Sequence, residues 1–236
     1  MDKVSLLQKC LFFFIKKLKK LHIIHNIYIK YKFFIKKKSY SMNNEDIAVL
    51  EYFKDKKNGF YVDVGCHHPI YINNTYLLYK QSWSGINIDV SQFSIDLFNY
   101  MRPHDLNYNC AVSNKNEIVK LFFQKEFSQL STIESNQAKT VFQGNIKEKN
   151  IQAFTLNEIL NRDKYKNKKI DFLNIDVEGA DLKVLEGLSF DKFEPELICL
   201  EIHDKEVKDS KIYSYLVNKK YELMWSGIFS HLFKKV

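Results

Sequence analysis

The sequence predicts a doubly wound α/β fold, with a mostly parallel sheet and helices on both of its faces. From residue 41 onward, short hydrophobic runs of strand length alternate with longer amphipathic segments of helical period. Glycines and polar residues follow these runs directly, at the strand ends where ligands bind in open sheets of this kind. A final pair of runs, 221–225 and 229–233, predicts a closing hairpin.

The elements follow one another in a regular order. The expected strands are Phe60–Val64, Gly85–Asp89, Leu106–Val112, Ile170–Ile175 and Glu196–Ile202, with Ile118–Phe123 pairing beside the third. The expected helices are 44–57, Thr75–Gln81, Ser91–Met101, Thr155–Asn161, Ala180–Leu188 and Lys205–Lys219. Asn44 is a candidate cap for the first helix. Residues 125–150 are polar and are expected to form an irregular, substrate-facing insertion.

The positive charge is confined to the N-terminus. Residues 1–40 hold eleven lysines against one acid, Asp2, which gives this segment a net charge of +10. The whole chain has a net charge of +8, so the remaining residues carry −2. A basic chain often binds nucleic acid, but here the charge belongs to an arm and not to the body of the protein. We therefore expect a basic, aromatic-rich arm over residues 1–40 and one catalytic domain over 41–236.

The arm has an amphipathic pattern of its own. Apolar residues at 7, 11, 14, 15, 18 and 21 fit a helical stripe flanked by lysines. Such a segment could lie in the headgroup region of an anionic membrane, pack on the domain or a partner, or contact RNA or DNA. The run Cys10–Ile15 is far shorter than the roughly 20 apolar residues of a spanning helix. The expected location is cytoplasmic, with peripheral contact to the inner face of the membrane through the arm.

The cysteines are far apart and form no CxxC pair. Cys10, Cys66, Cys110 and Cys199 are expected to be free thiols in a reducing compartment. Because no His/Cys spacing is typical of a zinc site, no metal is predicted.

The first strand ends in a glycine turn. In Phe60–His68 the glycine, Gly65, lets the backbone turn sharply and approach a ligand without a Cβ clash. Asp63 before it suits a cationic or amine group. The segment does not match GxGxxG, which weakens the prediction of a dinucleotide site.

Three later strands end in residues suited to a nucleoside. Asp89 could accept both hydroxyls of a ribose. The small residues of Asn109–Ser113, Ala111 among them, could line an adenine slot together with Asn109. Asp176 and Glu178 stand at a strand-to-helix turn before Gly179.

Four segments, taken together, resemble the FkbM family of methyltransferases. They are Phe60–Pro69, Asn74–Tyr76, Trp83–Asp89 and Ile170–Asp181. The resemblance runs from Gly59 to about Asp204. It implies a Rossmann-like class I methyltransferase fold with a seven-stranded sheet, S-adenosylmethionine as cofactor, and usually O-methylation of a hydroxyl on a sugar, a glycan or a natural product.

The resemblance also implies roles for single residues. Gly65 would form the turn under the methionine part of the cofactor, Asp63 would lie near its amino group, and Asp89 would bind its ribose. Cys66 stands where a small residue, often alanine, is common. The cofactor-binding residues are therefore expected to be Asp63, Gly65, Cys66, Asp89, Asn109, Ala111 and Asp176.

Several side chains could remove the proton of the acceptor hydroxyl. His67 and His68 lie at the mouth of the glycine turn, and imidazole titrates near working pH. Asp176 and Glu178 could act as a base, bind a metal, or fix the turn by accepting backbone N–H groups. His203, within Glu201–Asp204, could complete the acceptor pocket.

Two other functions share part of this pattern. An NAD-dependent oxidoreductase has the same fold class, but the glycine pattern after the first strand disfavours it. A nucleic-acid methyltransferase would use the basic arm. However, Asp176–Gly179 is not the Asn/Asp-Pro-Pro-aromatic motif of many base-amine methyltransferases. Nucleic acid is therefore the less favoured partner.

Overall fold

The computed structural model describes residues 17–125, 130–162, 165–166 and 168–236. The chain forms two compact units, Met1–Lys38 and Ser39–Val236. No helix in these described ranges is both long enough and apolar enough to cross a membrane.

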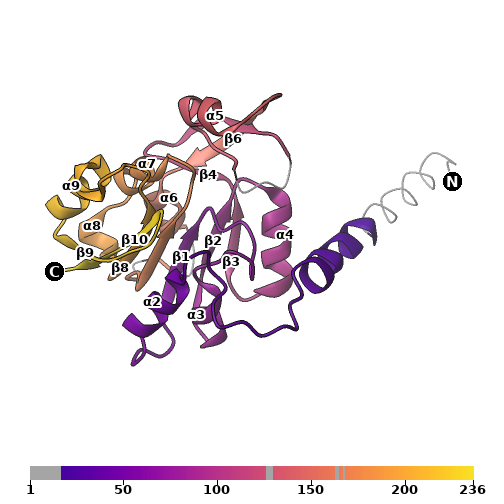
Figure 1. Ribbon diagram of the computed structural model, residues 1–236, viewed down its shortest axis with the longest axis horizontal. Helices are drawn as coiled ribbons and strands as arrows, with labels where there is room; N and C mark the ends of the chain where they lie inside the picture. The colour runs from indigo at the N-terminus through magenta and orange to yellow at the C-terminus, as the bar shows by residue number, and fades with distance from the viewer. Residues whose placement is uncertain (1–16, 126–129, 163–164, 167) are drawn as a thin grey trace, which may run out of the picture. The chain divides into compact units, whose positions relative to one another are not determined.

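The unit Ser39–Val236 is built on a seven-stranded sheet with the order β3-β2-β1-β7-β8-β10-β9 (Figure 1). Its strands are β1 (Phe60–Val64), β2 (Ser84–Asp89), β3 (Leu106–Asn109), β7 (Phe172–Ile175), β8 (Leu197–Glu201), β9 (Tyr221–Ser226) and β10 (Ser230–Lys235). The first five are parallel to one another, and β10 is antiparallel to both β8 and β9. The predicted parallel sheet with a C-terminal hairpin is confirmed.

The strand order reverses between β1 and β7. The chain runs outward from β1 through β2 to β3 and then returns to the other side of β1. At such a switch point the two connections leave in opposite directions and open a crevice at the carboxyl ends of the strands. The topology alone therefore places a crevice at the carboxyl ends of β1 and β7.

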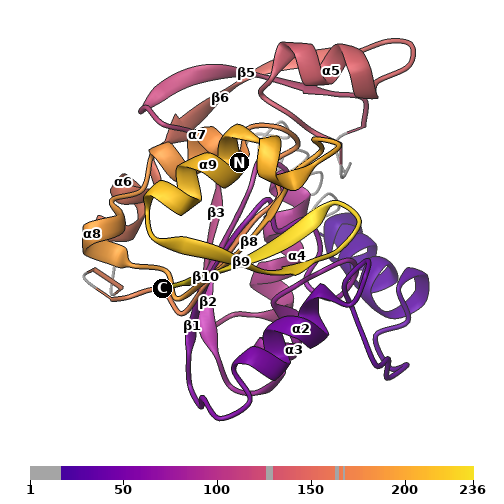
Figure 2. The same cartoon turned by 60° about the vertical axis from the view of Figure 1, so that its left-hand side comes forward.

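Both faces of the sheet are buried by helices (Figure 2). On one face of the sheet, Phe60, Val62 and Val64 pack with apolar residues of the helices that follow the second sheet in the chain. On the other face, Tyr61 packs with apolar residues of the helices α2 (Glu45–Tyr52) and α3 (Tyr76–Lys80). This alternation follows from the two-residue period of a strand. The later helices are α6 (Leu156–Asn161), α7 (Asp181–Glu186), α8 (Phe190–Phe193) and α9 (Lys211–Asn218), and the other helices on the sheet are α2, α3 and α4 (Gln92–Met101).

A second, three-stranded sheet leaves the main one after β3. It has the order β4-β6-β5 and consists of β4 (Ala111–Val112), β5 (Glu117–Phe123) and β6 (Lys147–Phe154). The single strand expected over 106–112 is therefore wrong, because the chain changes sheets at Cys110. The expected pairing of 118–123 beside that strand is also wrong, since β5 pairs antiparallel with β6.

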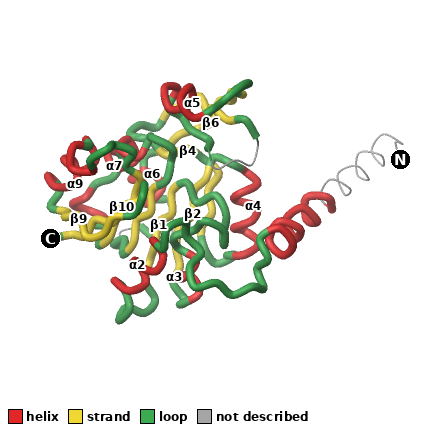
Figure 3. Tube along the Cα trace, viewed as in Figure 1, coloured by secondary structure: helices red, strands yellow, loops and turns green. Residues whose placement is uncertain are grey.

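The segment expected to be irregular contains two regular elements. Among its described residues lie α5 (Ser135–Val141) and the first half of β6, next to each other in Figure 3. Most of β6 is exposed or only half-buried, and Ala153 is its one buried residue. A strand with little apolar burial lacks the alternation that identifies strands in a sequence, which explains why it was missed.

Three helix ends differ from the predictions. The first helix ends at Tyr52, because Phe53 turns inward and packs on Trp83 with ring centroids 4.9 Å apart. Asn44 adopts a left-handed conformation (φ 68°) and its side chain makes no cap bond, so the predicted cap is wrong. The last helix begins only at Lys211, after a short 3₁₀ turn, η2 (Val207–Asp209), and is capped by Ser210, whose side chain accepts the N–H of Tyr213 at 2.9 Å. The helix α8 was not predicted.

The described part of the first unit is helical over residues 17–24 and continues into a π-helical turn, η1 (His25–Lys30). Ile23, Asn26 and Ile27 are buried. Leu18 and Leu21 from the predicted apolar stripe are exposed, and the stripe positions 7, 11, 14 and 15 lie outside the described residues.

Candidate functional site

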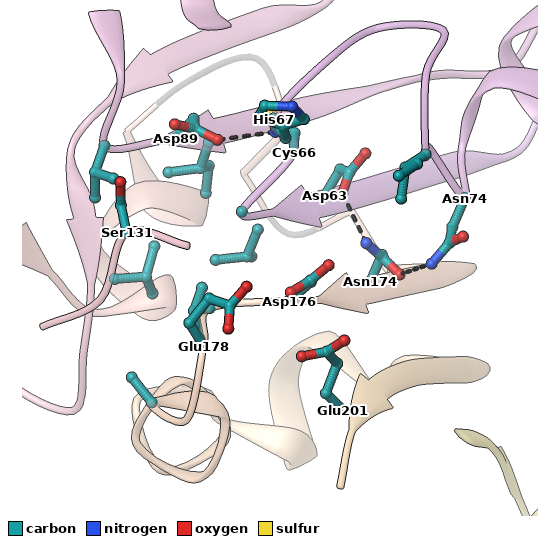
Figure 4. A pocket seen from close by; sticks show the side chains of 18 of the residues that line it. Asp63, Cys66, His67, Asn74, Asp89, Ser131, Asn174, Asp176, Glu178 and Glu201 are labelled. Atoms are coloured by element: carbon teal, nitrogen blue, oxygen red, sulfur yellow. Dashed lines mark hydrogen bonds between the residues drawn. The ribbon is translucent and has the colours of Figure 1, made fainter. Parts of the chain in front are cut away.

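A cavity lies at the carboxyl ends of the parallel strands, on both sides of the switch point (Figure 4). Residues from the ends of β1, β2, β7 and β8, together with β4, form its walls. The predicted site residues that line it are Asp63, Gly65, Cys66, His67, Asp89, Ala111, Asp176 and Glu178. His68, Asn109 and His203 are not among the described residues that line it.

The glycine turn is held against the end of β7. Gly65 has φ +81°, which favours glycine, and a Cβ there would lie 1.7 Å from the carbonyl oxygen of Asp176. The N–H groups of Gly65 and Cys66 both donate to the carbonyl of Ile88. Gly65 is therefore required by the neighbouring backbone itself, before any contact with a ligand is considered.

Asp63 is the centre of a buried hydrogen-bond network. Its carboxylate accepts hydrogen bonds from Thr75 Oγ1 at 2.8 Å, from Asn174 Nδ2 at 2.9 Å and from Asn73 Nδ2 at 3.2 Å. Burial raises the pKa of Asp63, while these donors and Arg102 oppose the rise. Because its lone pairs already serve the protein, Asp63 shapes the cavity wall more than it offers a free partner to a ligand.

Arg102 completes this network from the end of α4. Its guanidinium is fully buried and donates to Thr75 Oγ1 at 2.8 Å, Asn73 Oδ1 at 2.8 Å and the carbonyl of Pro69 at 2.7 Å. It also donates to the hydroxyl of Tyr61, which in turn bonds Asp105. One cation thus holds the loop after the glycine turn against the sheet.

Asp89 stands at the end of β2 with its carboxylate at the cavity. It accepts the N–H of His67 at 2.8 Å and that of Ser91 at 2.7 Å, which fixes its orientation. Burial raises its pKa to about 6, against these two bonds. A carboxylate has about four lone-pair sites, so it can still accept hydroxyl groups.

The wall beyond Asp89 is small and apolar. Cys110, Ala111 and Val112 all line the cavity. Asn109, predicted to join them, is exposed and donates from its side chain to the carbonyl of Asp89 at 3.0 Å. It therefore fastens β3 to β2 in place of facing a ligand.

The two histidines after the turn differ completely in position. His67 lines the cavity and has a left-handed backbone (φ 47°). His68 is fully buried, and its Nδ1 accepts the N–H groups of Ile70 and Tyr71, both at 3.1 Å. His68 therefore stabilises the loop, and it is not placed to meet a substrate.

Three carboxylates meet on the other side of the switch point. One oxygen each of Asp176, Glu178 and Glu201 lies within 4.8 Å of the others, and Figure 4 shows the three groups facing one another. We call them the acidic cluster. Glu178 has φ +54° and the following Gly179 φ +92°, so an uncommon turn carries the Glu178 side chain. Oxygens this close could hold a cation, an alternative that the sequence left open for Asp176 and Glu178.

Burial and mutual repulsion disfavour the charged forms of these acids. Burial, then Glu201 and Glu178, raise the pKa of Asp176 well above its usual range. Burial and Glu201 raise the pKa of Glu178 to about 7. In the first turn of α7, burial and Glu201 likewise raise the pKa of Asp181 to about 7. Carboxyl groups that titrate near neutral pH are typical of proton-transferring sites.

His203 supports the acidic cluster from outside. Its Nε2 lies 3.4 Å from a carboxylate oxygen of Glu201, and this contact raises the pKa of the imidazole. The side chain is 43% exposed, and its ring lies beside Phe229 with centroids 5.5 Å apart. Its expected part in the acceptor pocket is thus an indirect one, through Glu201.

Sequence reasoning missed several residues of the site. Asn174 bonds both Asp63 and Asn74, and Leu130 and Ser131 reach the cavity from the excursion between β5 and α5. Asn174 directly precedes Ile175-Asp176 at the same strand end, which could have identified it. Leu130 and Ser131 follow no strand, so no local pattern points to them.

Comparisons with known proteins bear on the family of this chain. The sequence profile of the methyltransferase FkbM domain matches residues 63–223. No curated protein matches the chain in sequence. A solved methyltransferase FkbM from Methylobacillus flagellatus is similar over 83% of this chain with a TM-score of 0.48 and 12% identity, and the match spans 56% of that structure's length. A TehB-like SAM-dependent methyltransferase from Corynebacterium glutamicum is similar over 81% of this chain and 88% of its own, with a TM-score of 0.42 and 9% identity.

The profile match is the comparison that decides the family. It covers well over half of the chain, from the glycine turn through the acidic cluster to β9. The seven-stranded sheet is the fold that the resemblance in the sequence implied. The chain belongs to the family of the methyltransferase FkbM domain.

Proposed function

We propose that this protein transfers a methyl group from S-adenosylmethionine to a hydroxyl of a sugar or glycan. One observation carries the proposal: a single cavity joins a ribose-type carboxylate, Asp89, to an acidic cluster across the switch point. The first half suits a nucleoside cofactor and the second half suits a hydroxyl acceptor. The two halves meet at Gly65, whose backbone touches that of Asp176.

The chemistry of the cofactor half suits S-adenosylmethionine. Asp89 would accept the ribose hydroxyls, and the small apolar wall of Cys110 to Val112 would take the adenine. Gly65 and Cys66 would lie under the methionine part. NAD is the second candidate, but it needs close backbone approach to a pyrophosphate, which the turn at Cys66 and His67 does not offer.

The cofactor supplies a methyl group on a positively charged sulfur; the protein must align the acceptor oxygen and remove its proton. We assign the removal of this proton to Glu178. Its pKa of about 7 makes it half ionised at neutral pH, so it is a competent base that also releases the proton. Asp176, whose pKa burial and Glu201 raise well above its usual range, lies beside Glu178 in the acidic cluster and would bond the acceptor hydroxyl. His67 is the alternative base, on the cofactor side of the cavity.

The acceptor half favours a molecule rich in hydroxyl groups. The carboxyl groups of the acidic cluster can each bond a hydroxyl. At the rim, Met42, Leu130 and Phe229 line the cavity and are 58%, 42% and 45% exposed. Carboxyl groups together with exposed apolar and aromatic side chains suit a sugar ring, which has polar edges and apolar faces. A natural product with a hydroxylated ring would satisfy the same groups.

Two measurements test the proposal. Isothermal calorimetry should give tight binding of S-adenosylhomocysteine, the demethylated cofactor, and much weaker binding of NAD. Transfer of a labelled methyl group should then be seen with hydroxyl-rich glycans and not with RNA or DNA. Tight NAD binding would contradict the cofactor assignment, and transfer to nucleic acid alone would contradict the acceptor assignment.

A further inference from the structure

The described part of the first unit exposes an unbroken positive charge. Residues 17–38 contain no Asp or Glu. All of their lysines are exposed: Lys17, Lys19, Lys20, Lys30, Lys32, Lys36, Lys37 and Lys38. These lysines give the segment a positively charged surface that attracts anions.

The same segment exposes large apolar side chains among the lysines. Leu18 and Leu21, three residues apart on the helix, are 49% and 54% exposed. A second group follows the π-helical turn, with Ile29 63%, Phe34 70% and Ile35 45% exposed. Single exposed apolar residues are common, but five within 18 residues, all within two residues of a lysine, form a surface that can bind both negative charge and apolar groups.

We infer that residues 17–38 bind the surface of an anionic lipid bilayer. Lysines attract the negative headgroups, and Leu18, Leu21, Ile29, Phe34 and Ile35 can enter the boundary between headgroups and acyl chains. Either signal alone gives weak anchoring, whereas the two together give reversible binding. The inference does not depend on the proposed methyl transfer.

The composition favours a bilayer over a nucleic acid. Binding to RNA or DNA is typically built on arginine and on aromatic rings that stack with bases. Residues 17–38 contain no arginine, and four of the five exposed apolar residues are aliphatic and have no ring to stack. Aliphatic side chains gain free energy chiefly by leaving water, which a bilayer allows.

The test is sedimentation of the full chain with vesicles. Vesicles of phosphatidylcholine containing phosphatidylglycerol should bind the protein at about 0.1 M salt and release it near 1 M salt, where the screening length falls from about 10 Å to about 3 Å. Vesicles of phosphatidylcholine alone should bind it far more weakly. Equal binding to neutral vesicles, or no binding to anionic ones, would overturn the inference.

Matched variants separate the arm from the rest of the chain. Each lysine removed should lower the partition coefficient about fivefold. The triple change Lys36→Gln, Lys37→Gln, Lys38→Gln should therefore weaken binding by roughly a hundredfold. The control makes the same change of charge at exposed lysines of the other unit: Lys205→Gln, Lys208→Gln, Lys211→Gln. Equal losses in the two triple variants would mean that net charge, and not this surface, binds the vesicles.

A second pair of variants tests the contribution of the exposed apolar side chains to vesicle binding. Phe34→Ser should weaken vesicle binding about tenfold. Ile118→Ser, which removes an equally exposed apolar side chain (69% against 70%), should leave it unchanged. If Phe34→Ser has no effect, or if the chain binds an RNA oligonucleotide or a second copy of itself while ignoring anionic vesicles, residues 17–38 are not a membrane surface.

Discussion

Replacing Glu178 with Gln removes one ionisable group from the acidic cluster and keeps the size of the side chain. It should change two measurable properties in opposite directions. Methyl transfer should fall, because the proposed base is lost. Stability should rise at neutral pH, because a carboxylate that is unfavourable in its charged form has been removed.

The size and sign of the stability change follow from the pKa. Glu178 has its pKa raised from 4.5 to about 7 by burial and by Glu201. At about 1.4 kcal/mol per pH unit this difference corresponds to about 3 kcal/mol. A raised carboxyl pKa means that the group's contribution to stability is complete below pH 4.5 and is lost as the pH rises through about 7.

The variant should therefore match the wild type near pH 4 and exceed it above pH 7. For a domain of this size, about 3 kcal/mol corresponds to about 6 to 12 °C in melting temperature. Calorimetric unfolding at steps of pH measures this difference. Activity measured on the same samples should fall by about a hundred- to ten-thousandfold.

Glu206→Gln is the control, since Glu206 is exposed and lies outside the acidic cluster. It should alter neither the melting temperature nor the rate. If Glu178→Gln keeps normal turnover, Glu178 is not the base. If its stability relative to the wild type falls as the pH rises, the cause assigned to the raised pKa is wrong.

Three further predictions concern the rest of the cavity. Asp89→Ala should weaken S-adenosylhomocysteine binding in calorimetry by about ten- to a hundredfold, since charge-assisted hydrogen bonds contribute about 1.5–3 kcal/mol; unchanged affinity would remove Asp89 from the ribose site. Gly65→Val should fail to give a folded protein by circular dichroism, because its Cβ would meet the Asp176 carbonyl 1.7 Å away. A well-folded Gly65→Val protein would show that the backbone there can move. Methyl transfer should persist in excess EDTA, because Glu178 is proposed to act without a metal; loss of activity that Mg²⁺ restores would make the acidic cluster a cation site.

Local chemistry at the strand ends was predictable from the sequence. Asp63, Gly65, Asp89 and Asp176 each follow or end a hydrophobic run, and parallel strands bring such ends to one edge. These residues could therefore be predicted from their immediate neighbours in the chain. His68 was not predictable in this way, because a histidine beside a turn can face the cavity or support the loop, and only its contacts to Ile70 and Tyr71 distinguish the two.

Long-range pairings were not predictable. Arg102 reads as a polar residue at a helix end, yet it is fully buried because Asn73, Thr75 and Pro69 surround it from a distant loop. The strand β6 was not predicted, for a related reason. Its pairing with β5 rests on backbone hydrogen bonds in a largely exposed sheet, so burial left little mark on its side chains.

The small sheet has a consequence for how this family could diversify. Entry and exit of the excursion are neighbours, since Ala111 of β4 pairs with Ala153 of β6. Chain added, removed or exchanged between these two points leaves the main sheet and Asp89 in place. Yet Leu130 and Ser131 from the same excursion line the cavity. The segment between β4 and β6 can therefore be exchanged as a unit. Exchanging it between relatives is expected to change which acceptor is methylated, while the affinity for the cofactor is unchanged.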